Sequence, residues 1–126
     1  MDELEDAMLF VRENGMAEFV PNHPHYEFDR SDESVLLIPL TEIAPVIRSR
    51  VPRLDNARGI SVLDGFQSGS QLPQIFVIAN TDPCSTHRYR LLDGYHRMYL
   101  SLAVGYLSIP AEVFPDNRHL FENLRV

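Results

Sequence analysis

The chain of 126 residues contains no lysine, a single cysteine and no long hydrophobic run. With Cys84 alone, no internal disulfide bond can form, which is typical of a protein kept in a reducing compartment. No apolar segment approaches the roughly 20 residues needed to cross a bilayer. The acidic start, MDELEDAMLF, lacks the basic region of a signal peptide. We therefore expect a cytoplasmic protein that does not enter a membrane.

Because lysine is absent, all 11 basic residues are arginines. Arginine carries a planar fork of donors that suits phosphate and carboxylate groups, although the base composition of a genome produces the same usage. The net charge is −7, and the acidic side chains are concentrated in residues 1–34, while the rest of the chain is near neutral. This balance argues against a non-specific DNA-binding protein, whose affinity depends on cationic contacts to phosphates.

Hydrophobic periodicity and turn residues predict an α+β protein, with one mixed sheet and helices packed on it. We expect an acidic helix-and-loop extension over residues 1–34 and a folded domain over residues 35–126. The predicted strands cover residues 35–40, 74–80, 88–92 and 109–113, and the predicted helices cover residues 2–14, 57–67, 95–104 and 116–126.

Two of these elements predict the position of the core. Residues 35–40, VLLIPL, form a continuous apolar run that is typical of a buried strand. Residues 95–104 are almost free of charge, so we expect a helix buried in the core and ended by Gly105. The helix at the start of the chain would turn an apolar stripe toward the core, formed by Leu4, Met8 and Val11, with Ala7 alongside.

The segment LLDGYHR joins the third predicted strand to the buried helix. Gly94 permits a positive φ or a close backbone approach, and a helix N-terminus offers unpaired N–H groups and a partial positive charge. With His96 and Arg97 in the same turn, these features predict an anion site best suited to phosphate. The alternative is a purely structural turn, in which Asp93 caps the helix and Arg97 pairs with a nearby acid.

The segment YRLLDGYHRMYLSLAVGYLSIPAEV resembles the signature of the ParB/sulfiredoxin fold, in which a strand leads into a G-x-H-R or G-x-R-R turn and a buried helix. Upstream, VLLIPLTEIAP, LDNARGISVLDGFQSG and LPQIFVIAN are similar to the preceding strand, helix and strand of that fold, in the same order. The resemblance covers about residues 35–115.

The resemblance implies a nucleotide site that binds ATP or ADP with Mg²⁺. Gly94, His96 and Arg97 match the residues that surround the phosphates of ATP in sulfiredoxin-like proteins. Arg58 falls where sulfiredoxins carry a phosphate-contacting lysine, and Ser61 matches a serine on the same helix.

The same turn also resembles the DGHHR turn of free-serine kinases built on this fold. It implies that Asp93 positions Mg²⁺ or an acceptor hydroxyl. A separate acidic residue serves as the base in those enzymes, and Glu42 in PLTEI is one candidate for it. The candidate catalytic residues are therefore Asp93, His96 and Glu42.

Two positions differ from the better-known members of this fold. Tyr95 replaces the cysteine of sulfiredoxins, which argues against sulfinic acid reduction. His96 replaces the first arginine of the ParB turn, which argues against chromosome partitioning. The expected function is phosphoryl transfer or nucleotide hydrolysis, with an unknown small molecule or protein as acceptor. The alternatives are a non-catalytic module that binds a ligand or partner, and a ParB-like nuclease, against which the acidic charge argues.

Three other groups of residues could carry chemistry. Two histidines in a proline-broken loop without a firm third ligand are typically solvent-facing rather than metal-binding. A Cys/His pair without an orienting acid or helix dipole is a poor nucleophile. An arginine-rich loop is either solvated or closes over a bound phosphate. In the same order, the possible metal ligands are His23, His25 and Asp29, the Cys/His pair is Cys84 and His87, and the loop arginines are Arg48, Arg50 and Arg53.

Overall fold

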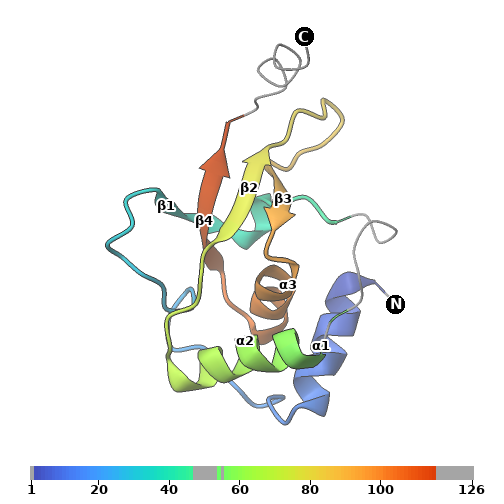
Figure 1. The fold of residues 1–126 in the computed structure, drawn as a ribbon. Coiled ribbons are helices and arrows are strands. Elements are labelled where there is room, and N and C mark those ends of the chain that lie inside the picture. Colours follow the sequence, from blue (N-terminus) through green and yellow to red (C-terminus); the bar gives the residue numbers. More distant parts are fainter. Residues whose placement is uncertain (1, 47–53, 55, 116–126) are drawn as a thin grey trace.

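The computed structural model describes residues 2–46, 54 and 56–115. The described part contains a four-stranded mixed sheet with strand order β1-β4-β2-β3, and the α+β class is confirmed (Figure 1). The predicted helix over residues 116–126 lies outside the described residues. The elements are α1 (Glu3–Glu13), β1 (Val35–Pro39), the 3-10 helix η1 (Leu40–Glu42), α2 (Asn56–Ser68), β2 (Ile75–Ala79), β3 (Tyr89–Asp93), α3 (Tyr95–Val104) and β4 (Ser108–Phe114).

The sheet combines two kinds of strand pairing. β2 and β3 form an antiparallel pair. β2 also pairs with β4 in parallel, and β4 pairs with β1 antiparallel. β3 is an outer strand of the sheet and runs directly into α3, which packs against both α1 and α2 (Figure 1). The turn between β3 and α3 lies beside the beginning of α2.

α3 is the buried helix that its apolar sequence predicts. Met98 and Leu100 are almost inaccessible to solvent, and burying a leucine fully contributes about 1.5–3 kcal/mol. Gly105 ends the helix with a left-handed φ of 97°, and its N–H donates to the carbonyls of Ser101 and Leu102. A rigid, buried helix therefore supports the β3–α3 turn.

The prediction that β1 is buried is wrong. Leu36 and Leu37 remain 54% and 45% exposed, and Ile38 is the one strand residue that is fully buried. β1 lies at the edge of the sheet and pairs with β4 alone, so it lacks a second neighbouring strand to cover it. An apolar run predicts a strand, but it does not distinguish an edge from the centre of a sheet.

α1 also buries a face that differs from the predicted one. Leu4 and Met8 of the predicted stripe are exposed, whereas Val11 and the neighbouring Ala7 are buried as predicted and Phe10 is buried in addition. The Phe10 ring packs so closely on α2 that a Cβ at Gly59 would lie 2.5 Å from its Cζ atom. These residues belong to the same hydrophobic core as α3 and the sheet, so the acidic N-terminal segment contributes to that core.

Candidate functional site

The β3–α3 turn depends on Gly94, which is the N-cap residue of α3. Gly94 has φ 110° and ψ 31°, in the left-handed region, where residues with a Cβ are strained. A Cβ at this position would also lie 2.5 Å from Cγ2 of Ile75. Both properties predicted from the sequence, the positive φ and the close approach, are confirmed, and they bring the start of α3 against β2.

A cavity of about 790 Å³ opens beside this turn. The beginning of α2 forms one side of it, and the end of β3 with the first turn of α3 forms the other. The amides of a first helical turn have no acceptors inside the helix, and the dipole adds partial positive charge there. Two helix N-termini therefore face one cavity. Its lining residues are Ala57, Arg58, Ser61, Val62, Leu72, Pro73, Asp93, Gly94, Tyr95, His96 and Arg97.

Six of the seven predicted site residues line this cavity, and Glu42 does not. Glu42 ends η1, and its Oε2 lies 3.7 Å from Nη1 of Arg88 in an ion pair. The structure therefore does not bring Glu42 together with the others. The six are Arg58, Ser61, Asp93, Gly94, His96 and Arg97.

The charged groups in the cavity wall give it a positive balance. The exposed Arg58 on α2 and the partly buried Arg97 on α3 face a single carboxylate, that of Asp93, which is exposed at the end of β3. His96 is buried to 9% exposure. With the two helix N-termini, this arrangement is suited to a polyanion.

Arg97 is fixed in place by the segment that precedes β2. Its Nη2 donates a hydrogen bond to the carbonyl of Gln74 at 3.2 Å, while its Nε is buried without a hydrogen-bond partner among the described residues. Tyr26 lies beside it and donates from its hydroxyl to the carbonyl of Pro73 at 2.6 Å. Burial raises the pKa of Tyr26 above its usual range, and the nearby Arg97 partly offsets that rise. Tyr26 thus belongs to the surroundings of the site.

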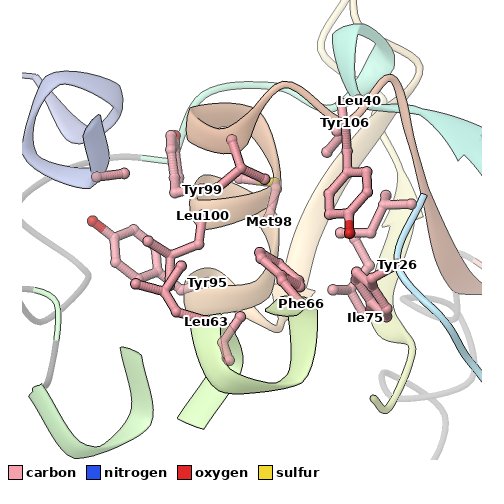
Figure 2. Close-up of a cluster of buried hydrophobic side chains, with 14 of the residues drawn as sticks. Tyr26, Leu40, Leu63, Phe66, Ile75, Tyr95, Met98, Tyr99, Leu100 and Tyr106 are labelled. Atoms are coloured by element: carbon pink, nitrogen blue, oxygen red, sulfur yellow. The ribbon is translucent and has the colours of Figure 1, made fainter. Parts of the chain in front are cut away.

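Sequence reasoning did not find Tyr26, because it lies in a proline-broken loop far from the β3–α3 turn along the chain. Tyr95, which follows Gly94, is buried, and its ring packs against Tyr99 with ring centroids 5.0 Å apart (Figure 2). The Tyr99 hydroxyl in turn accepts a hydrogen bond from the Val46 N–H. Tyr95 therefore joins the floor of the cavity to the hydrophobic core.

The other candidate groups lie apart from this cavity. The interpretation of both histidines as solvent-facing holds for His23 and is wrong for His25, which is buried and whose Nδ1 lies 2.8 Å from the Tyr26 carbonyl oxygen. Asp29 accepts hydrogen bonds from Ser31. No group of three potential metal ligands is present among the described residues.

Cys84 is exposed in the turn between β2 and β3. The neighbouring His87 has its Nδ1 3.4 Å from the hydroxyl oxygen of Ser85. The predicted loop arginines Arg48, Arg50 and Arg53 lie outside the described residues. In the part of the chain that the structure describes, no helix has the length and apolarity needed to span a bilayer.

No protein-family model matches the sequence, and no curated protein matches it. Solved structures do match the fold. Sulfiredoxin from Arabidopsis thaliana superposes with a TM-score of 0.51 and 21% identity, over 73% of this chain and 98% of that one. The C-terminally truncated chromosome-partitioning protein ParB from Caulobacter crescentus, complexed with CTP-gamma-S, superposes with a TM-score of 0.52 and 13% identity.

The second superposition covers 73% of this chain and 53% of the ParB chain, so the protein spans about half the length of that structure. These similarities show the fold: the chain has a ParB/sulfiredoxin-like fold, as its turn sequence predicts.

Proposed function

We propose that the protein binds a nucleotide, ATP or ADP, through its phosphates in the cavity between α2 and α3. The observation that carries this proposal is the convergence of two helix N-termini and two arginines on the left-handed turn at Gly94. The ParB structure of the same fold holds CTP-gamma-S, which supports a nucleotide over another polyanion.

Each residue of the cavity has a role that its position allows. The backbone at Gly94 and the first turn of α3 would donate N–H groups to phosphate oxygens. Arg58 and Arg97 would balance the phosphate charge, and the Ser61 hydroxyl would donate one further hydrogen bond. The fixed position of Arg97 favours binding, since little side-chain freedom is lost when the ligand arrives.

Mg²⁺ fits this set of donors. Nucleotide-bound Mg²⁺ is usually held by one or two carboxylates together with phosphate oxygens and water, and Asp93 provides one exposed carboxylate at the cavity. The ion would balance phosphate charge when bound. Asp93 would hold it or orient an acceptor hydroxyl at the same place.

We further propose that the site transfers the terminal phosphoryl group to a small-molecule or protein hydroxyl, or to water. The hydroxyl proton would pass to Asp93 or His96 as the oxygen forms its bond to phosphorus. The bond from phosphorus to the leaving group would break, which releases the nucleoside diphosphate from ATP or the nucleoside monophosphate from ADP. Such reactions depend mostly on positioning and charge stabilisation. The second candidate, a module that binds nucleotide without turnover, is favoured by the small number of acid–base groups in the cavity.

Isothermal calorimetry with ATP, ADP and CTP in the presence of Mg²⁺ tests the binding proposal. We expect Arg58→Gln to weaken binding at least about tenfold, since the loss of a charge-assisted hydrogen bond costs about 1.5–3 kcal/mol. Arg90→Gln is the matched control, because Arg90 is also exposed but does not line the cavity. Phosphate or ADP release then separates turnover from simple binding. Absence of binding by all three nucleotides would contradict the proposal.

A further inference from the structure

Arg97, one of the two arginines of the cavity, has only part of its guanidinium available to a ligand. Its Nη2 donates to the carbonyl of Gln74 at 3.2 Å, and its Nε is buried without a hydrogen-bond partner among the described residues. A Cβ at Gly94 would lie 3.3 Å from the same Nη2, so the guanidinium lies close over the turn. A guanidinium carries five N–H donors, and those left for a phosphate are the two of Nη1 and the second one of Nη2.

The acceptor of this bond is itself held in place. The Gln74 side chain donates from its Nε2 to Oδ2 of Asp32 at 3.4 Å and to Oε1 of Glu112 at 3.3 Å. One residue earlier, the carbonyl of Pro73 accepts the hydrogen bond of 2.6 Å from the Tyr26 hydroxyl. The Gln74 carbonyl therefore has a fixed position from which it orients the guanidinium.

Tyr26 belongs to a short segment that is bonded to the wall of the cavity. Leu72 donates its backbone N–H to the carbonyl of Glu27 at 2.9 Å, and Leu72 and Pro73 both line the cavity. With the bond from Tyr26 to Pro73, two neighbouring residues of one segment are bonded to two neighbouring residues of the other. The loop before β1 therefore fixes the chain that leads to the Gln74 carbonyl.

The Tyr26 hydroxyl is buried near the guanidinium of Arg97. Tyr26 is 2% exposed, and its ring stacks on Phe66 with centroids 5.8 Å apart (Figure 2). Burial raises the pKa of Tyr26, and the charge of Arg97 partly offsets that rise, as expected for two groups in close proximity. A neutral phenol leaves the positive charge of Arg97 for a ligand, whereas a carboxylate at the same place would pair with it and compete with phosphate.

We infer that Tyr26 is a positioning residue of the proposed nucleotide site, and that it holds the guanidinium of Arg97, through residues 73–74, in the orientation that phosphate meets. This role depends on the proposed function of the cavity. A guanidinium that is already oriented loses little freedom when the ligand binds, which strengthens binding. Tyr26 does not line the cavity, so its effect on the ligand passes through Arg97.

The Nε–Hε signal of Arg97 in the ligand-free, ¹⁵N-labelled protein tests the positioning directly. We expect this hydrogen to exchange with solvent at least about tenfold faster in Tyr26→Phe than in the original protein, because the guanidinium is then held less firmly. Tyr106→Phe is the matched control. Tyr106 also packs on Phe66, with ring centroids 5.1 Å apart, but it has no hydrogen bond to residues 73–74 in the described structure. An unchanged Arg97 signal in Tyr26→Phe would overturn the inference.

Calorimetry with Mg²⁺–ATP tests whether this positioning serves phosphate binding. Tyr26→Phe should weaken binding about three- to tenfold, and inorganic triphosphate should lose affinity by a similar factor because Arg97 contacts phosphate. Tyr106→Phe should leave both affinities unchanged. In an Arg97→Gln background, Tyr26→Phe should have no further effect, since the two residues act through one contact. The amide spectrum of each variant shows that it is folded.

The two measurements distinguish the role of Tyr26 from the proposed function. Equal losses of affinity in Tyr26→Phe and Tyr106→Phe, or additive losses in the double variant, would overturn the inference, because the change would then be a general loosening of the core. If the original protein bound neither ATP nor triphosphate, the proposed function would be contradicted, while the Arg97 signal would still decide whether Tyr26 holds the guanidinium.

Discussion

The guanidinium group of Arg97, which lines the cavity, donates a hydrogen bond to the backbone carbonyl of Gln74, 3.2 Å away. This bond joins the first turn of α3 to the segment that enters β2. Beside it, Tyr26 makes a similar bond to the carbonyl of Pro73. The proposed phosphate site is therefore supported by the segment that enters β2, which in turn is bonded to Tyr26 from the loop before β1.

Arg97→Gln should destabilise the protein by about 1–3 kcal/mol, because it removes the bond to Gln74 and leaves a partly buried carbonyl without its donor. Chemical denaturation measures this loss. Arg90→Gln, in an exposed arginine of β3, should change the free energy of unfolding by less than about 0.5 kcal/mol. Equal stability of the two variants would show that the Arg97–Gln74 bond does not support the fold.

Tyr26 should give the protein a specific sensitivity to alkaline pH. Its folded-state pKa is raised by burial, while the unfolded value is about 10. A raised folded pKa contributes stability that is complete below pH 10 and is lost as the pH increases above it. Denaturation curves at pH 8–11 should show this loss, and Tyr26→Phe should reduce it. Tyr99 and Tyr106 also have raised pKa values, so a residual slope is expected. An identical slope in the variant would contradict the prediction.

Gly94→Ala should be more destabilising than Gly105→Ala. Both glycines have a left-handed φ, but a Cβ at Gly94 would collide with Ile75, whereas none of the described atoms lies within 4 Å of one at Gly105. The strained φ costs on the order of 1 kcal/mol at each position, and overpacking adds about 1–3 kcal/mol at Gly94 alone. Thermal or chemical denaturation compares the two variants. Equal losses would mean that β2 and the turn are not in close contact.

Phe10→Ala should destabilise the protein by about 3–5 kcal/mol, as is usual for a buried phenylalanine. Met8→Ala, on the exposed side of the same helix, should cost less than about 1 kcal/mol. Comparison of the two unfolding midpoints tests whether α1 is part of the core. If both variants retained the original stability, α1 would instead be an appended segment.

The turn at the site was predictable from the sequence because its determinants are local. A glycine between a strand and an apolar helix constrains the backbone wherever the sheet lies, and Asp93, His96 and Arg97 follow from their distance to Gly94 along the chain. Arg58 and Ser61 came from the resemblance in the order of the elements, and the structure places both in the cavity.

What the sequence could not show depends on contacts between distant segments. The exposure of Leu36 follows from the position of β1 at the sheet edge. The choice of buried face in α1 follows from the fit of Phe10 against Gly59 of α2. Glu42 was chosen as a candidate base because it follows β1 closely along the chain. Its ion pair with Arg88 depends instead on how η1 lies beside β3. None of these relationships leaves a periodic signal in the sequence.

The most direct test of the account is a titration of the ¹⁵N-labelled protein with Mg²⁺–ATP, followed by nuclear magnetic resonance. If the phosphates bind where two helix N-termini converge, the largest shifts will be in the amides of residues 94–97 and of Arg58 and Ser61. Arg58→Gln will weaken the response, and Arg90→Gln will not. Shifts confined to other parts of the chain, or no shift at millimolar nucleotide, would contradict the central claim.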